Sequence, residues 1–199
     1  MVKGEELIPS SYDTIGSIII LDIPKELQKK KKLIAEALLK THPSVKTVAM
    51  RIAAHKGLYR VRAIKVIAGE RKTETMYTES GCRLMLDPAK VYFSPRLGNE
   101  RLRVANDVKK NEDVLVMFSG VGPYCCVIAK KGLAKKVVGI EINPAAHRYA
   151  LQNVKLNKLE RKVEVYKGDV RKVLPKLKMK FDRIVMPLPK TAEKFLEVA

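Results

Sequence analysis

The sequence predicts two domains: a small α+β domain, followed by an α/β domain with a parallel, doubly wound sheet. Two observations carry this prediction. From residue 113 onward, short buried strands alternate with helical segments, a pattern typical of a parallel sheet covered by helices. Before residue 95 the apolar segments are short and β-rich, with one helical stretch among them, as in a compact α+β unit.

The first domain is expected to open with one strand and one helix. Residues 15–22 (IGSIIILD) form a β-branched apolar run, and residues 26–42 have helical spacing. Four short β-rich segments follow. We therefore expect an α+β domain over residues 1–94.

A linking helix is expected over residues 95–112. The segment SPRLGNERLRVANDV has a proline near its start and an amphipathic spacing of Leu97, Leu102 and Val104. Both features indicate a helix that joins the two halves of the chain.

The second domain is expected over residues 113–199. A doubly wound cofactor domain usually has five or more strands, and only four are predicted, so we expect a sheet truncated after its fourth strand. Its exposed edge would favour aggregation unless another copy covers it. The expected strands are 113–118, 136–141, 162–169 and 181–186, and the expected helices are 123–132, 144–158 and 190–198.

The charge of the chain predicts a polyanionic partner. Forty Lys and Arg stand against 21 Asp and Glu, for a formal net charge of +19. Basic segments occur in both halves, so RNA or DNA phosphates would bind in a salt-sensitive way. The alternative is a solvated lysine-rich surface, as in thermophile proteins.

Composition also indicates where the protein is located and whether it holds a metal or disulfides. The sequence has no run of 18 apolar residues and no secretory signal, so a soluble, cytoplasmic protein is expected. Three cysteines and three scattered histidines lack metal-ligand spacing. We expect free thiols and no metal.

The segment FSGVGP follows a buried strand and opens a helix. Gly120 and Gly122 would let the backbone approach a ligand closely, and the helix N-terminus favours an anion. Glu141 ends the next strand, where it can accept the hydroxyls of a ribose, and Asp169 ends the third, where it can meet an adenine amino group. These strand ends predict an adenosine-bearing ligand; the alternative is turn glycines beside a solvent-facing Glu141.

The turn favours S-adenosylmethionine over a dinucleotide. The sequence reads G-V-G-P-Y-C and lacks the third glycine of the dinucleotide fingerprint. At the fourth strand end, MPLPKTAEKF places two prolines where a rigid, donor-poor loop would lie against a planar base.

In this order, the segments VYFSPRLGNER, MFSGVGPY, GIEINPAAHRYALQNVKLNKL, KGDVR and DRIVMPLPKTAEKFL resemble the archaeal and eukaryotic tRNA (guanine-N1)-methyltransferases that modify guanosine 37. The resemblance runs from about residue 9 to the end of the chain. It implies a ferredoxin-like or related α+β domain before a Rossmann-like class I methyltransferase domain, with S-adenosylmethionine as cofactor and the anticodon region of tRNA as partner. A counterpart of the small N-terminal domain of that family is not expected in this sequence.

The resemblance also implies roles for individual residues. Glu100 would be the general base for the guanine N1 proton, and Arg60 would hold the guanine O6. Pro187 would lie at the methyl-transfer position, while Arg60, Tyr92 and Arg96 would contact RNA. Without the resemblance, the expected role of Glu100 is that of an ion-pair partner of Arg96 or Arg103 on the surface of a helix. Cofactor contacts are expected from Arg96, Phe118, Gly120, Gly122, Glu141, Ile142, Asn143, Asp169, Val170, Met186 and Pro187.

Two departures from the family keep alternatives open. Val116 stands where the family has the Asp of D-x-F-A-G, and Pro187 stands where it often has the Asn of N-x-P. One alternative is the related wyosine-pathway transferase, which moves the aminocarboxypropyl group of the same cofactor. The other is a catalytically impaired RNA-binding remnant.

Overall fold

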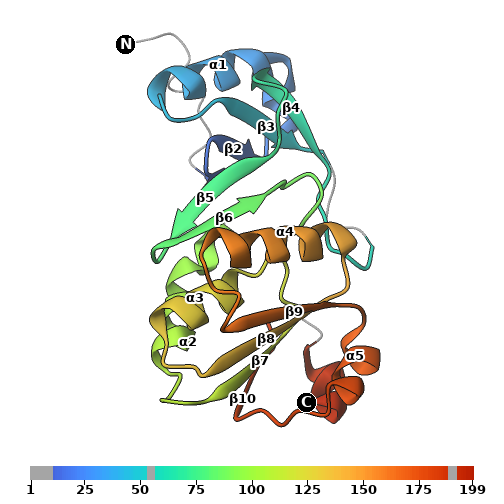
Figure 1. The fold of residues 1–199 in the computed structure, drawn as a ribbon. Helices are drawn as coiled ribbons and strands as arrows, with labels where there is room; N and C mark the ends of the chain where they lie inside the picture. The colour runs from blue at the N-terminus through green and yellow to red at the C-terminus, as the bar shows by residue number, and fades with distance from the viewer. Residues whose placement is uncertain (1–10, 53–56, 188–191) are drawn as a thin grey trace. The chain divides into compact units, whose positions relative to one another are not determined.

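The computed structural model describes residues 11–52, 57–187 and 192–199. They form two compact units (Figure 1). The first unit comprises residues 1–77 and 86–96, and the second comprises residues 78–85 and 97–199.

The first unit contains a four-stranded sheet in the order β1-β2-β3-β4. Its outer pairs are antiparallel and its central pair, β2 with β3, is parallel. The single strand expected over residues 15–22 was wrong, because Gly16 takes φ +56° and turns the chain between β1 and β2. A side chain on Gly16 would also collide with the Met76 carbonyl oxygen. The strands are β1 (Tyr12–Ile15), β2 (Ile18–Leu21), β3 (Thr47–Arg51) and β4 (Ile64–Gly69).

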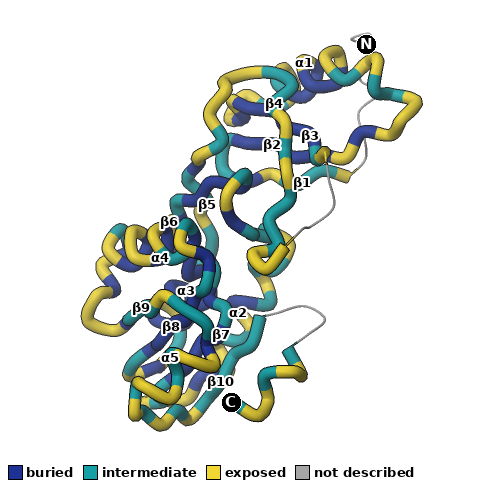
Figure 2. Tube along the Cα trace, turned by 90° about the vertical axis from the view of Figure 1, so that its right-hand side faces the viewer, coloured by how far each residue is buried: buried dark blue, intermediate teal, exposed yellow. Residues whose placement is uncertain are grey.

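Helix α1 (Lys31–Thr41), preceded by the 3₁₀ helix η2 (Lys25–Lys30), packs on this sheet. Ile34 and Leu38 of α1 are fully buried in the core that also holds Ile19 and Val48, and the dark-blue stretches of α1 and the strands in Figure 2 show this inner layer. Among the described residues the path is β-β-α-β-β. It is an α+β unit, but its path differs from the βαββαβ path of a ferredoxin-like domain.

Strands β5 (Thr75–Glu79) and β6 (Cys82–Leu86) form a two-stranded sheet. Ser80 and Gly81 connect them, with φ of +47° and +76°. Positive φ at both central residues is the geometry of a type I′ hairpin turn.

The second unit is built on a parallel sheet in the order β10-β7-β8-β9. The chain therefore runs outward from β7 to β9 and then returns to place β10 on the other side of β7. This reversal is the topological switch point, outside whose carboxyl ends a doubly wound sheet binds its ligand. The strands are β7 (Asp113–Met117), β8 (Lys136–Glu141), β9 (Val163–Lys167) and β10 (Arg183–Val185).

Helices cover both faces of this sheet, as expected (Figure 1). Leu115, Met117 and Ile140 face a core shared with α5 and the 3₁₀ helix η4, whereas Gly139, on the other face, lies against α3. The alternation follows from the two-residue period of a strand. The helices are α2 (Gly98–Asn106, after the 3₁₀ turn η3, Pro95–Leu97), α3 (Pro123–Lys131), α4 (Pro144–Leu156), α5 (Val170–Leu177) and η4 (Ala192–Val198).

Two helices differ from expectation. The linking helix was expected to reach residue 112, but α2 ends at Asn106. Helix α5 was not expected, because its lysines and Pro175 mask an apolar face; Val173, Leu174 and Leu177 nevertheless pack against the sheet core.

Candidate functional site

The carboxyl ends of the four parallel strands lie along one edge of the second unit's sheet. Met117 pairs with Ile140, and Glu141 pairs with Lys167. The final residue of β10 pairs inside β7, so the segment after β10 reaches the same edge. This edge brings together ten predicted cofactor residues: Phe118, Gly120, Gly122, Glu141, Ile142, Asn143, Asp169, Val170, Met186 and Pro187.

The turn between β7 and α3 exposes backbone at this edge. Phe118, Gly120 and Gly122 all have positive φ, of +59°, +59° and +81°. A Cβ on Gly120 would find no heavy atom within 4 Å, so a ligand can approach its backbone closely. Gly122 is the N-cap of α3 and offers no capping side chain. The first N–H groups of α3 therefore lack an intrahelical partner and suit an anion.

Glu141 supports the turn and remains able to bind a ligand. One carboxylate oxygen accepts the Gly120 N–H at 2.7 Å, and the other accepts the Asn143 N–H at 2.6 Å. Burial raises the pKa of Glu141, and the Asn143, Gly120 and Ile142 N–H groups oppose this rise. Each carboxylate oxygen can accept a second hydrogen bond. The Glu141 carboxylate therefore offers an acceptor that suits hydroxyl groups such as those of a ribose.

Asn143 and Asp169 cap the helices that follow their strands. The Asn143 side chain accepts the Ala145 N–H at 2.9 Å. The Asp169 carboxylate accepts the Arg171 N–H at 2.9 Å and also binds its guanidinium, with contacts of 3.0 and 2.6 Å. These contacts with Arg171 lower the pKa of Asp169. Asp169 is thus anionic and firmly held, and its expected contact with an adenine amino group stays a prediction.

Aromatic and apolar side chains line the β7 and β10 side of the edge. The Phe118 ring meets the Phe195 ring edge to face, with centroids 4.7 Å apart. Met186 packs against the same cluster. Pro187 follows β10 and is partly exposed, whereas Pro189 and the rest of MPLPK beyond Pro187 lie outside the described residues.

Glu100 lies on α2 and is half-exposed. Its carboxylate receives two hydrogen bonds from Arg103, at 2.7 and 2.8 Å, and Arg103 also contacts Asp107 at 2.7 Å. The hydrogen bonds and charge of Arg103 lower the pKa of Glu100. The pairing of Glu100 with Arg103 is the one expected without any family resemblance, and the role of Glu100 as a base stays a prediction.

Asn153 of α4 and Asn157, the C-cap residue of that helix, bind strand β6 within the second unit, and sequence reasoning missed both. Asn153 accepts the Met85 N–H at 2.7 Å and donates to the Met85 and Val121 carbonyl oxygens at 3.0 and 2.9 Å. Asn157 makes the matching pair of bonds to the N–H and carbonyl of Arg83. Their i,i+4 spacing on a helix matches the i,i+2 spacing on strand β6. Asn153 thereby connects α4 and β6 to the turn between β7 and α3.

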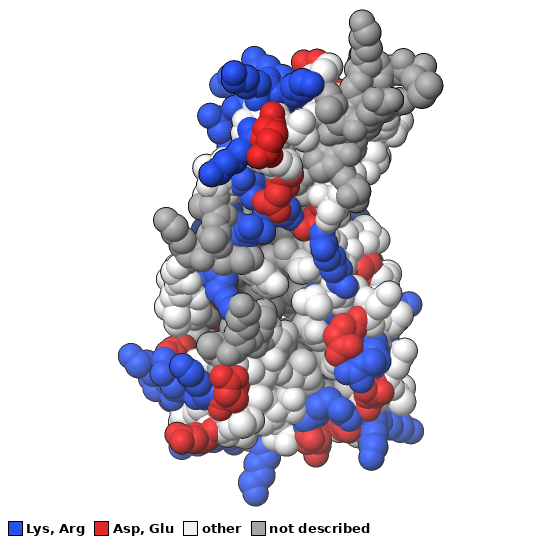
Figure 3. Space-filling model, turned by 180° about the vertical axis from the view of Figure 1, so that it is seen from behind, with Lys and Arg blue, Asp and Glu red and all other residues white. Residues whose placement is uncertain are grey.

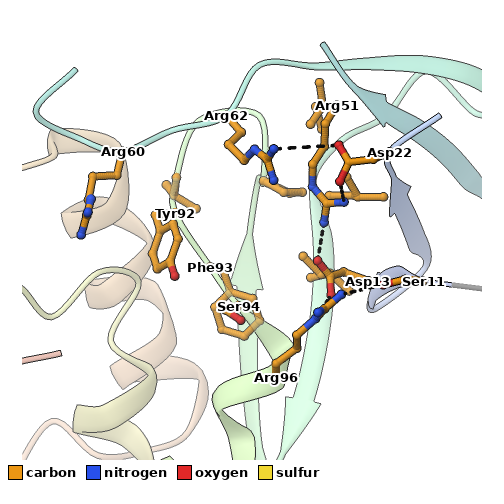
Figure 4. Close-up of a pocket in the computed structure, with 15 residues that line it drawn as sticks. Ser11, Asp13, Asp22, Arg51, Arg60, Arg62, Tyr92, Phe93, Ser94 and Arg96 are labelled. Atoms are coloured by element: carbon orange, nitrogen blue, oxygen red, sulfur yellow. Dashed lines mark hydrogen bonds and ion pairs between the residues drawn. The ribbon is translucent and has the colours of Figure 1, made fainter. Parts of the chain in front are cut away.

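The first unit contains a second candidate site, a cavity of ≈ 360 Å³ (Figure 4). Arg60, Tyr92 and Arg96, the three predicted RNA contacts, all line it. Arg60 has φ +53°, a left-handed conformation that is uncommon for a residue other than glycine. Sequence reasoning missed four further charged lining residues, which are Asp13, Asp22, Arg51 and Arg62.

The charged side chains of this cavity form a chain of alternating sign. Asp22 contacts Arg62 at 3.9 Å and Arg51 at 3.1 Å. Arg51 also binds Asp13, which in turn holds Arg96 at 2.7 Å. Figure 4 shows these contacts as dashed lines, with Arg60 and Tyr92 on the opposite side of the cavity. No sequence motif joins these residues, because they come from segments that lie far apart in the sequence.

Basic side chains gather elsewhere on the first unit. Helices η2 and α1 present Lys25, Lys29, Lys30, Lys32 and Lys40 as exposed residues, and Figure 3 shows Lys and Arg side chains gathered at the end that carries α1. Within residues 11–52, 57–187 and 192–199, no three His, Cys, Asp or Glu side chains gather as a metal site. No helix in those ranges has the length and apolar character needed to span a membrane.

Two family models match the chain. The TRM5/TYW2 methyltransferase domain matches residues 75–199. The TYW2 N-terminal domain matches residues 2–73.

Curated relatives match nearly the whole chain. The tRNA (guanine(37)-N(1))-methyltransferase Trm5b of Pyrococcus abyssi is 46% identical over 192 residues, which cover 96% of this chain and 56% of the relative. The tRNA 4-demethylwyosine(37)-methyltransferase Taw21 of Saccharolobus solfataricus is 40% identical over 100% of this chain and 75% of the relative. The chain thus spans little more than half the length of the Pyrococcus relative.

Solved structures of similar proteins share the fold. The crystal structure of Pyrococcus abyssi Trm5b matches with a TM-score of 0.86 and 44% identity, over 100% of this chain and 58% of that chain. A complex of aTrm5 with tRNALeu matches with the same TM-score and identity, over 97% of this chain and 56% of that chain. The α/β fold with a parallel sheet and a small preceding α+β unit is therefore that of the class I methyltransferases. The chain belongs to the TRM5/TYW2 methyltransferase family.

Proposed function

We propose that the chain transfers a methyl group from S-adenosylmethionine to N1 of guanosine 37 in tRNA. The observation that carries the proposal is the strand edge at the switch point, where Glu141 retains acceptor capacity beside the open backbone of Gly120. Relatives named for this reaction, 46% identical over 96% or more of the chain, support it. Structures of relatives in complex with adenosine and with AdoMet support the choice of cofactor.

The residues of the second unit fit the cofactor. Glu141 would accept the ribose hydroxyls, and the α3 N-terminus would hold the carboxylate. Phe118 and Met186 would offer apolar surface to the adenine, and Asp169 and Ile142 would lie at its rim. When bound, the cofactor supplies an electrophilic methyl group on a sulfonium.

The substrate roles follow the chemistry of guanine. N1 is a weak acid, so Glu100 would receive its proton while Arg60 stabilises the charge that develops on O6. Because Arg103 lowers the pKa of Glu100, this carboxyl is ionised at neutral pH, and the same pairing makes it a weaker base. Tyr92 would form a wall of the RNA site, and Arg96 would bind a phosphate.

The test is to incubate the chain with S-adenosylmethionine and a tRNA transcript that carries guanosine 37. Mass spectrometry should then detect 1-methylguanosine at that position. Glu100→Ala and Arg60→Ala should abolish methylation and leave calorimetric binding of S-adenosylmethionine nearly intact. Asp107→Ala is the matched control, because it removes the other carboxylate paired with Arg103 and should keep the activity. If both site variants lost cofactor binding, their assignment would be contradicted.

Transfer of the aminocarboxypropyl group is the second candidate. The match of residues 2–73 to the TYW2 N-terminal domain favours it, as does the similarity to a Pyrococcus horikoshii TYW2 structure at 31% identity. The same incubation separates the two reactions, because the aminocarboxypropyl adduct is much heavier than a methyl group.

An RNA-binding remnant without turnover is the third candidate. The net charge of +19 suits tRNA binding, and Val116 and Pro187 depart from the family pattern. Calorimetry decides: absence of heat with S-adenosylmethionine at high protein concentration would favour the remnant, and micromolar binding would favour the enzyme.

The proposal also covers the cellular location of the protein, the part of tRNA that it contacts and its oligomeric state. We expect it to act in the cytoplasm on the anticodon region of tRNA. A second copy covering the edge of the parallel sheet stays a prediction, which light scattering of the purified chain would test.

A further inference from the structure

Asp13 occupies an unusual position in the cavity of the first unit. Its carboxylate lies between two guanidinium groups, those of Arg51 and Arg96, and its side chain is only 17% exposed. Arg51 is similarly enclosed and contacts Asp22 as well. Asp13 and Asp22 thus share the charge of Arg51, and the bond from Arg96 to Asp13 is additional to that pairing.

That additional bond determines the orientation of Arg96. The Arg96 side chain is 63% exposed, and an arginine exposed to this extent samples many rotamers unless a partner holds it. Asp13 binds its Nε at 2.7 Å, and Ser11 accepts a bond from its Nη2 at 3.3 Å. A guanidinium has five N–H donors, so among the residues that the structure describes three N–H groups of Arg96 remain beyond these two bonds and can bind a phosphate.

We propose that Asp13 is a positioning residue, which fixes Arg96 so that its remaining N–H groups bind an RNA phosphate at the cavity. The inference rests on the proposed function, since it takes tRNA as the ligand. The negative charge of Asp13 by itself should weaken RNA binding, whereas the proposed role of Asp13 strengthens it. A carboxylate beside a phosphate repels it, so a favourable contribution can arise only through the arginine that it holds.

The test is the affinity of the Asp13→Asn variant for a tRNALeu transcript. This change keeps the shape of the side chain and removes its charge. We expect binding about tenfold weaker, as for the loss of one well-oriented charged hydrogen bond, with unchanged S-adenosylmethionine affinity. Asp22→Asn is the matched control: it removes a carboxylate from the same Arg51 but keeps the contact between Asp13 and Arg96, so tRNA should bind at least as tightly as to the wild type.

A double-variant cycle separates positioning from general destabilisation. In an Arg96→Gln background, Asp13→Asn should produce no further loss of tRNA affinity, because its effect passes through Arg96. Equal losses in both backgrounds, tighter binding by Asp13→Asn, or weakened cofactor binding would each overturn the proposal. Failure of the wild-type chain to bind tRNA would instead refute the proposed function, so the two failures are distinguishable.

Discussion

Replacement of Asn153 by Asp should loosen both the second unit and its cofactor edge. Asn153 is fully buried, and its amide nitrogen donates to the carbonyl oxygens of Met85 and Val121 at 3.0 and 2.9 Å. The substitution keeps the size of the side chain and its acceptance of the Met85 N–H. It also turns the donor into an oxygen that faces two carbonyl oxygens, so both donated bonds are lost.

The expected cost follows from these two bonds. A buried polar group that loses its partner costs about 1–3 kcal/mol, so the free energy of unfolding should fall by about 2–6 kcal/mol at pH 7. Burial and the facing carbonyls would raise the folded-state pKa of the new carboxyl above the unfolded value of about 3.9. The part of the penalty that comes from ionisation is therefore absent below the unfolded pKa, grows as the pH rises towards the folded pKa, and is complete above it. A protonated carboxyl has a single O–H donor, so the loss of one of the two donated bonds persists at every pH.

Urea unfolding at several pH values measures this effect. The deficit relative to the wild type should shrink as the pH is lowered from 7 towards 4. Asn157→Asp is the matched control, because Asn157 donates to the Arg83 and Asn153 carbonyl oxygens at 2.7 Å but not to the turn. Both variants should lose stability, and only Asn153→Asp should also weaken S-adenosylmethionine binding. A loss below about 0.5 kcal/mol, within the ordinary range for surface changes, would refute the reasoning.

Two further predictions concern charged pairs. Glu79→Gln removes the carboxylate that accepts two bonds from the buried Arg101, at 2.5 and 2.6 Å. This change should lower the free energy of unfolding by about 3–5 kcal/mol. Urea unfolding measures the change, and a value near zero would show that the pair contributes nothing to stability. Arg103→Gln removes the group that lowers the pKa of Glu100, so the acid limb of the methylation rate against pH should move to higher pH. An unmoved limb would argue against Glu100 as the base.

The sequence predicted the second unit well because its signals are local. Each strand is a short apolar run, and a turn or a helix of opposite periodicity separates it from the next. Errors arose where a local signal was ambiguous. Gly16 divides one apolar run into two strands, and Pro175 with its neighbouring lysines hides a helix whose apolar face is clear only against the sheet.

The site was predictable to the extent that strand ends define it. Glu141 could be found from its distance in sequence from the glycine turn, because parallel strands bring their carboxyl ends together. The contacts of Asn153 and Asp13 could not be found in this way. Asn153 is 68 residues from Met85, and Asp13 is 83 residues from Arg96, so tertiary packing alone brings each pair together.

The structure also gives a physical reason why Val116 is compatible with an intact cofactor turn. Val116 lies in the middle of the sheet, paired with Gly139 on one side and Val185 on the other, and is fully buried. An apolar side chain is favourable at such a place, where a carboxylate would need a compensating partner. The turn itself is held by later residues: Glu141 accepts an N–H at its centre, and Asn153 donates to a carbonyl next to it. Val116 therefore leaves intact the backbone geometry of the turn at which we propose that the cofactor binds.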